Sequence, residues 1–227
     1  SQSVPEGAPV VPVSETLSSL RWNQDKCLVE VIDQTLLPHA LHWIELADLD
    51  DYCHAISAMQ VRGAPLIGIT AAFGLANALA RDPSTENLHA ASRSLLATRP
   101  TAVNLRWALD AVIAYVPELD PAGRADAALA RAQALRASDI ANCSRIGEHG
   151  LQLLRALRSA GTLNIMTHCN AGGLATIEWG TALAPVYKAH REGIPVHVWV
   201  SETRPRNQGV NLTAWELQRA GVPCTVV

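Results

Sequence analysis

Apolar and polar residues follow a helical spacing through most of the first 160 positions. Apolar residues recur there every three or four positions, which predicts helices over residues 48–59, 65–80, 84–97, 103–116 and 122–158. The last of these is long for a globular helix, so we expect an interruption near Asn142. Before the helices, alternation over residues 28–32 and an apolar run at 41–46 predict a β-hairpin.

The pattern changes near Gly161. Short apolar runs then alternate with helical patterns, which predicts strands at 163–167, 196–200 and 224–227 and helices at 174–191 and 211–220. This alternation predicts an α/β fold with a parallel sheet that is covered on both faces. We expect three parts: a flexible N-terminal tail over 1–20, a mostly helical domain with a small β-hairpin over 21–160, and a parallel-sheet domain over 161–227.

The last predicted strand runs to the final residue, Val227. A parallel sheet of only three strands leaves apolar surface bare. We therefore expect the chain to be a fragment, or one piece of a cleaved protein. We then expect a missing or cleaved C-terminal segment of the same protein to pack against this chain and complete the sheet.

Composition narrows the class of protein. The 227 residues are 48% hydrophobic and 17% charged, as in globular proteins, and the net charge of −3 gives no reason to expect nucleic acid or an anionic membrane as a partner. No uninterrupted apolar run reaches the roughly 18 residues that span a bilayer. Five cysteines at irregular spacing argue for a reducing compartment, and we expect the cytoplasm. No His/Cys cluster has the spacing of a metal site.

The run Thr-His-Cys-Asn-Ala-Gly-Gly at 167–173 is the strongest candidate for chemistry. It places Cys169 between the end of a predicted strand and the start of a predicted helix. Free N–H groups at a helix start can lower a thiol pKa and hold an anion. The competing interpretation is a loop cysteine beside two turn glycines. His168 should point to the opposite face of the strand, so we interpret it as a packed structural residue.

Ligands of open α/β sheets bind beyond the carboxyl ends of the strands. The loop at 201–209, which includes Gln208, follows the second strand of the predicted sheet and is rich in polar and cationic residues. Parallel strands would place it beside the loop of Cys169. Taken alone, its simpler interpretation is a solvated loop.

Two arginines stand at helix entries in the first part of the chain. Arg62, Gly63 and Ala64 precede Pro65, which suits the first turn of a helix. Backbone N–H groups and a guanidinium in this arrangement can hold a phosphate. Arg99 stands at a second helix entry. For both, the alternative is an ordinary helix entry with a surface arginine.

Taken together, five blocks resemble the methylthioribose-1-phosphate isomerase family. They occur in the family's order along nearly the whole chain, at residues 31–38, 61–68, 99–105, 167–176 and 202–209. The broader family includes ribose-1,5-bisphosphate isomerases and the regulatory subunits of the eukaryotic factor that exchanges guanine nucleotide on initiation factor 2. The regulatory subunits are binding proteins that lack this isomerase chemistry. The blocks at 61–68 and 167–176 favour the enzyme branch of the family.

The resemblance implies a small domain of hairpin and helices followed by a Rossmann-like domain, in a homodimer. It implies an intramolecular oxidoreductase that converts 5-methylthioribose 1-phosphate into 5-methylthioribulose 1-phosphate in methionine salvage, with no metal or organic cofactor. Two alternatives stay open. One is an isomerase of ribose 1,5-bisphosphate or 5-deoxyribose 1-phosphate, and the other is a non-catalytic sugar-phosphate or nucleotide sensor on the same fold.

By resemblance, Cys169 is the catalytic cysteine. The implied substrate-binding residues are Arg62, Gly63, Ala64, Arg99 and Gln208. The family's catalytic aspartate matches no segment up to Val227, so we expect this chain alone to be inactive. Transfer of hydrogen through an enediolate and transfer by a hydride shift are both compatible with the sequence.

Overall fold

The computed structural model describes residues 16–157 and 161–227. A small antiparallel sheet opens the fold, with strands β1 (Leu20–Asn23), β2 (Leu28–Ile32) and β3 (Trp43–Leu46) in the order β1-β2-β3. Val29 pairs with Trp22 on one side and Leu46 on the other. The predicted hairpin is confirmed as β2 and β3. Sequence reasoning missed β1, because four residues are too few to establish a period.

The predicted N-terminal tail ends sooner than expected. Ser19 and Leu20 are fully buried, and the N–H of Ser19 donates to the carbonyl of Ile177 at 2.9 Å. These two positions therefore belong to the packed fold. Residues 1–15 of the predicted tail lie outside the described residues.

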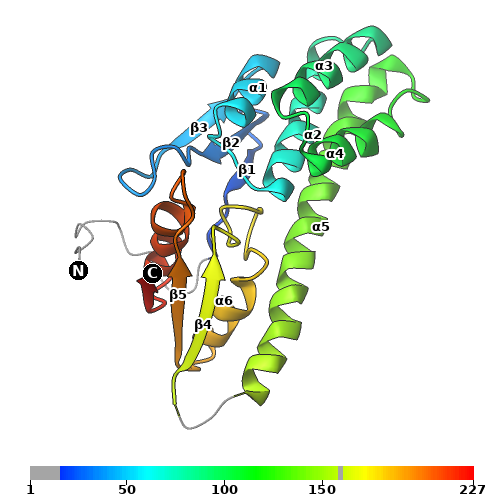
Figure 1. Cartoon of the computed structure of the whole chain (residues 1–227). Coiled ribbons are helices and arrows are strands. Elements are labelled where there is room, and N and C mark those ends of the chain that lie inside the picture. The colour runs from blue at the N-terminus through cyan, green and yellow to red at the C-terminus, as the bar shows by residue number, and fades with distance from the viewer. Residues whose placement is uncertain (1–15, 158–160) are drawn as a thin grey trace.

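Five helices follow the small sheet. They are α1 (Leu49–Ser57), α2 (Ala64–Arg81), α3 (Thr85–Thr98), α4 (Val103–Ile113) and α5 (Pro121–Ala156). Asp48 caps α1 by accepting the N–H of Asp51, and Ser84 caps α3 in the same way through Asn87. The apolar helix α2 lies at the centre and contacts the other four (Figure 1). It alone among the described helices is long and apolar enough to cross a membrane, but most of it is buried in the core.

The interruption predicted near Asn142 is wrong, since α5 is continuous from residue 121 to 156. Its first half packs on α2 and its second half on α6 (Ala184–Arg191), as Figure 1 shows. Packing along the whole length supplies the stability that an isolated helix would lack. Helix α5 therefore joins the helical part of the fold to the parallel sheet.

The parallel sheet contains β4 (Leu163–His168), β5 (Val196–Ser201) and β6 (Cys224–Val226), in the order β4-β5-β6. The three predicted strands and their parallel pairing are confirmed. The last connection contains a π-helical segment, η1 (Gly209–Ala214), that continues into α7 (Trp215–Arg219). The carboxyl ends of β4 and β5 point toward the helical part (Figure 1).

The helix predicted over 174–191 is wrong in its first half, because α6 begins only at Ala184. The N–H groups of Gly173 and Leu174 donate to the side chain of Glu216, and Gly180 adopts a φ of 79°. A loop therefore fills the space between β4 and α6. Pro185 lies in the first turn of the shortened helix.

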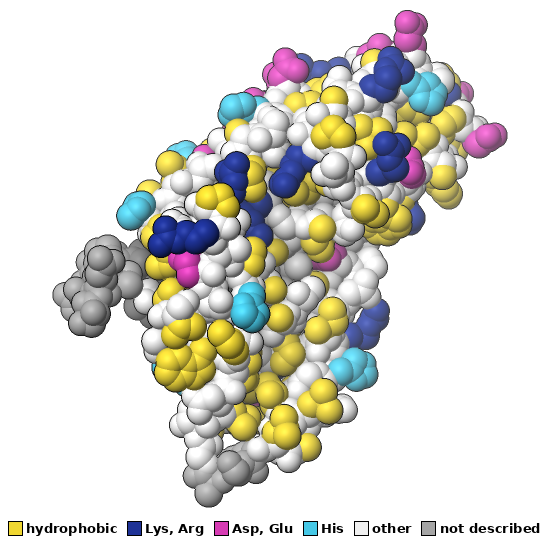
Figure 2. Space-filling view, viewed as in Figure 1, with side chains coloured by type: hydrophobic (Ala, Val, Ile, Leu, Met, Phe, Trp, Pro, Cys, Tyr) yellow, Lys and Arg dark blue, Asp and Glu magenta, His cyan; other side chains and the backbone are white. Residues whose placement is uncertain are grey.

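The expectation that both faces of the parallel sheet are covered is also wrong for the described residues. Alternate positions of β5 are buried and those of β4 are partly or fully buried, whereas Met166 is 58% exposed and Trp199 is 38% exposed. In Figure 2 hydrophobic side chains are visible on this face. Helix α6 lies behind the sheet in Figure 1, so the described helices cover the opposite face.

A small apolar cluster lies between the two sheets. Ile32 and Leu37 from the end of β2 and its loop pack there with Leu174, Leu212 and Trp215 from the parallel-sheet part. This packing brings the loops that follow β2, α1, β4 and β5 to one place. The candidate site is built from those loops.

Candidate active site

Arg62 joins the two parts of the fold. It stands between α1 and α2, and its guanidinium Nη1 donates to Oδ1 of Asn170 at 2.9 Å. Its Nη2 lies 4.0 Å from Sγ of Cys169. The structure therefore brings together the predicted cysteine and the predicted arginine, which come from opposite halves of the chain.

Cys169 directly follows β4 and has a φ of 57°, which a non-glycine residue rarely adopts. Its carbonyl accepts a hydrogen bond from Oγ1 of the buried Thr213 at 2.5 Å. The predicted helix start beside the thiol is absent, because α6 begins at Ala184. The positive group at the sulfur is the Arg62 guanidinium. His168 is exposed, so the interpretation as a packed residue is wrong.

The strained backbone at Cys169 has two counterparts near the same loops. Met59 has a φ of 62° and Asn207 a φ of 54°. Conformations of this kind cost about 1–3 kcal/mol each and persist where the surrounding structure enforces them, which is common at functional sites. Three of the five described non-glycine residues with positive φ therefore lie at these loops, and the other two are Cys27 and Trp179.

The start of α2 supplies the second part of the site. Gly63 is the N-cap with a φ of 90°, and a Cβ there would lie 2.3 Å from the carbonyl oxygen of Ala175. Only glycine fits this position. Pro65 has no N–H, and the N–H of Leu66 donates to the carbonyl of Ala175 at 3.4 Å. The N–H groups of Gly63 and Ala64 are the ones that an anion at this helix start would meet.

The loop after β5 is held by Glu202. Its Oε1 accepts the N–H of Gly209 at 3.0 Å and its Oε2 accepts the N–H of Val210 at 3.2 Å. These bonds anchor the first residues of η1 and fix the loop that carries Gln208. The polar loop is therefore an ordered wall of the site.

A cavity of about 250 Å³ opens between these loops. Its lining residues are Gln34, Thr35, Leu37, Met59, Arg62, Arg206, Gln208, Asn211 and Leu212. Two of the predicted binding residues, Arg62 and Gln208, thus face one cavity. Cys169 adjoins it through Arg62.

Two buried oxygen atoms on the cavity wall lack donors. Among the described residues no group donates to Oε1 of Gln34 or to Oε1 of Gln208. Gln34 is only 4% exposed, and its Nε2 donates to the carbonyl of Leu174 at 2.7 Å, which fixes the amide. A buried acceptor without a partner is costly, so the two side chains hold an unused hydrogen-bonding capacity next to the cavity. Sequence reasoning missed Gln34, although it lies in the block at 31–38.

The electrostatics of the site favour an anion. Burial lowers the pKa of Arg62, and the negative charges of Cys169 and Glu216 oppose this shift, while the nearby charge of Arg99 adds to it. Within residues 16–157 and 161–227, neither Arg62, Arg99 nor Arg206 forms an ion pair with a carboxylate within 4.0 Å. A phosphate would compensate these cations.

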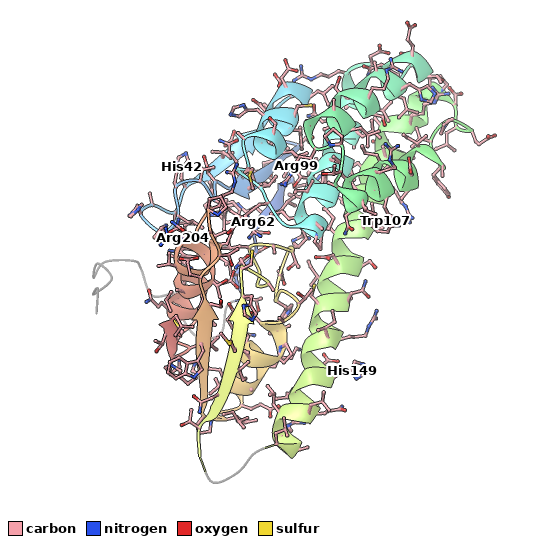
Figure 3. All side chains as sticks on the ribbon, viewed as in Figure 1. His42, Arg62, Arg99, Trp107, His149 and Arg204 are labelled. Atoms are coloured by element: carbon pink, nitrogen blue, oxygen red, sulfur yellow. The ribbon has the colours of Figure 1, made fainter. Side chains whose placement is uncertain are left out.

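Arg99 follows α3 as its C-cap residue. In Figure 3 Arg62 and Arg99 lie where the helical part faces the carboxyl ends of the parallel strands. Arg99 influences Arg62 through its charge but does not line the cavity. Among the described residues, no group of three or more His, Cys, Asp or Glu side chains is arranged to hold a metal ion.

The fold and the site together define an α/β protein with a cationic cavity and a cysteine at the end of a parallel strand. Residues 60–227 match the profile of the Initiation factor 2 subunit family, and the chain belongs to this family.

Its similarity to one class of enzyme is high. The methylthioribose-1-phosphate isomerase of Dechloromonas aromatica is 58% identical over 211 residues, which cover 92% of this chain and 58% of that protein. The enzyme of the same name from Rhodospirillum rubrum is 56% identical over 207 residues, covering 88% and 53%. The resemblance found in the sequence is thereby confirmed. The chain spans about half the length of the curated relatives it matches.

Two solved structures share the fold. The 5-methylthioribose 1-phosphate isomerase of Pyrococcus horikoshii OT3 matches with a TM-score of 0.84 and 31% identity, over 95% of this chain and 61% of that one. The translation initiation factor eIF-2B, subunit delta, from A. fulgidus matches with a TM-score of 0.82 and 35% identity, over 93% and 62%.

Proposed function

We propose that this protein is an aldose–ketose isomerase that converts 5-methylthioribose 1-phosphate into 5-methylthioribulose 1-phosphate in methionine salvage. The single observation that supports this most directly is the position of Arg62, which lines the cavity and lies 4.0 Å from the sulfur of Cys169. Relatives with 58% and 56% identity that carry this enzyme name support the choice of substrate.

The substrate phosphate is assigned to the start of α2. Arg62 and Arg99 would neutralise its charge, and the N–H groups of Gly63 and Ala64 would donate to its oxygens. Gln208 and Gln34 both line the cavity, and their side-chain amides would hydrogen bond with sugar hydroxyls. All five predicted contacts then serve one bound sugar phosphate.

The reaction moves hydrogen within the sugar and has no net redox change. The furanose ring opens when its ring oxygen takes a proton, which the resemblance assigns to an aspartate that is not among residues 1–227. Opening leaves C1 as an oxocarbenium whose exocyclic oxygen carries the phosphate. The sulfur of Cys169 removes the proton from C2, and the electron pair of that C–H bond forms a C1=C2 double bond. Loss of the proton on the C2 hydroxyl gives an enediolate with its negative charge on the C2 oxygen, and return of the first proton to C1 gives the ketose. Arg62 stabilises the enediolate.

The wider architecture follows the same proposal. The helical part over 21–160 and the sheet part over 161–227 act as two domains, the second of Rossmann type, and the site lies between them. Two copies form a homodimer in the cytoplasm. Residues 1–227 alone bind the substrate without turning it over, because the general acid is supplied from elsewhere in the protein.

Similarity to the A. fulgidus eIF-2B subunit, at 35% identity, supports a second candidate, a non-catalytic sugar-phosphate sensor. The test is an assay of ketose formation by the complete protein from three substrates: 5-methylthioribose 1-phosphate, 5-deoxyribose 1-phosphate and ribose 1,5-bisphosphate. We expect turnover, with the highest kcat/KM for the first. Binding of these compounds without turnover would support the sensor instead.

A further inference from the structure

Glu216 lies behind the site and is almost fully buried. It belongs to α7, is 3% exposed and does not line the 250 Å³ cavity. Its carboxylate accepts four hydrogen bonds, three from the loop after β4 and one from α6. The donors are Nδ2 of Asn170 at 3.0 Å, the N–H of Gly173 at 3.0 Å, the N–H of Leu174 at 3.3 Å and the hydroxyl of Tyr187 at 2.6 Å.

The loop is shaped to fit this carboxylate. A Cβ on Gly172 would lie 1.4 Å from Oε1 of Glu216, so the backbone packs directly against the acid. Three of the four donors cannot accept a hydrogen bond, since two are backbone N–H groups and one is an amide nitrogen. The side chain at position 216 must therefore offer two oxygen atoms that both accept hydrogen bonds, and a carboxylate does so.

Asn170 links Glu216 to Arg62 in the site. Its NH₂ group donates to Glu216 and to Oγ1 of Thr213 at 3.1 Å, while its oxygen accepts Nη1 of Arg62 at 2.9 Å. If the amide were rotated by half a turn, its NH₂ group would face the guanidinium, donor against donor. An acceptor at Glu216 prevents that rotation.

We propose that Glu216 is a positioning residue of the site: its carboxylate holds the Asn170 amide with the oxygen toward Arg62, and so keeps the guanidinium beside the sulfur of Cys169. The kinetic side of this inference rests on the proposed function. The structural side does not, because it concerns the placement of Arg62 at Cys169.

The test is Glu216→Gln in the complete protein, because glutamine keeps the shape and removes one acceptor. We expect kcat/KM to fall at least ~30-fold, because a hydrogen bond to a charged group is lost and Arg62 is displaced as well. In an Arg62→Ala background the same change should cost less than about threefold, because the two residues act as one unit. Additive losses would overturn the inference.

Glu30→Gln is the matched control. Glu30 is also a buried carboxylate, 8% exposed, and hydrogen bonds with Arg21 and Asn23 in the antiparallel sheet. This variant should change stability and leave kcat/KM within about threefold. Should Glu216→Gln fail to fold, Asn170→Ala cuts the same link and leaves Glu216 three donors. Full kcat/KM in Asn170→Ala would overturn the inference.

A second measurement is independent of isomerase activity. Mass spectrometry follows alkylation of Cys169 by iodoacetamide in the complete protein, with the exposed Cys27 as an internal reference. The guanidinium of Arg62 lies 4.0 Å from the sulfur, so its removal in Arg62→Ala and its displacement in Glu216→Gln should change the labelling rate of Cys169 at least ~3-fold relative to Cys27, in the same direction. If no sugar phosphate is turned over but labelling changes in this way in both variants, the proposed function fails and the inference stands. Unchanged labelling in Glu216→Gln would overturn it.

Discussion

The guanidinium Nη2 of Arg62 lies 4.0 Å from Sγ of Cys169, although 107 positions separate these residues in the sequence. Arg62 lies between α1 and α2 in the helical part, and Cys169 directly follows the parallel strand β4. A cation of this kind can stabilise a negative sulfur, a phosphate or an enediolate at the same place.

Arg62→Ala should weaken substrate binding and raise KM at least about tenfold, because a charge-assisted hydrogen bond of this kind contributes roughly 1.5–3 kcal/mol. Arg62→Lys keeps the charge but loses the planar pair of donors, so it should restore only part of the affinity. Steady-state kinetics with the complete protein check both variants. Equal KM values for the wild type and Arg62→Ala would count against a binding role.

Gln208→Leu should separate binding from stability. Oε1 of Gln208 is buried without a donor among the described residues, so its removal should not lower the free energy of unfolding. Loss of a hydrogen bond to the substrate should raise KM roughly fivefold. Kinetics and urea unfolding of the same preparation give both numbers. A large loss of stability with unchanged KM would show that the side chain is structural.

Gly63→Ala should destabilise the protein by at least ~1–3 kcal/mol. The φ of 90° is strained for any side chain, and the new Cβ would lie 2.3 Å from the Ala175 carbonyl oxygen. Gly123→Ala is the control, because a Cβ there meets nothing within 4 Å on the surface of α5. That change should stabilise by about 0.5–1 kcal/mol. Similar melting temperatures for the two variants would contradict the geometry at Gly63.

Asp139→Asn should change how stability depends on pH. Burial raises the pKa of Asp139, and the N–H of Ile177, which donates to Oδ2 at 3.1 Å, opposes the shift. Because the pKa of Asp139 is higher in the folded state than in the unfolded state, its protonation stabilises the fold. This contribution is complete at pH below the unfolded-state pKa of about 3.9, and it is lost as the pH rises through the folded-state pKa. Asparagine can still accept the Ile177 N–H through its oxygen.

Urea unfolding between pH 4 and pH 8 measures that contribution. The variant should be more stable than the wild type at neutral pH, and the difference should shrink as the pH is lowered. A difference in unfolding free energy that stays constant across this range would rule out the titration of Asp139 as its source.

The sequence predicts most of the elements because their periods are strong. The strand expected over 163–167 is observed over 163–168, and the helix expected over 84–97 is observed over 85–98. The loop before α6 could not be predicted in the same way. Its apolar residues have helical spacing, but two of its N–H groups bind Glu216, more than 40 positions later in the chain.

The residues of the candidate site also differ in whether the sequence alone reveals them. Cys169 and Arg62 stand out because they belong to blocks of unusual composition that resemble a known family. Glu216 does not, since a glutamate in an amphipathic helix is ordinarily solvent-exposed and only the fold shows that it is buried. Gln34 is hidden for a similar reason: its unpartnered oxygen becomes visible only when the cavity wall is complete.

The central claim is that the sulfur of Cys169 transfers the proton in an isomerase site. The most direct test is kcat for 5-methylthioribose 1-phosphate in the complete protein carrying Cys169→Ser, with the exposed Cys27→Ser as control. General acid–base catalysis is worth about 10² to 10⁴ in rate, so we expect kcat to fall at least ~100-fold in Cys169→Ser, with KM little changed and the control unaffected. A kcat for Cys169→Ser close to that of the wild type would contradict the account.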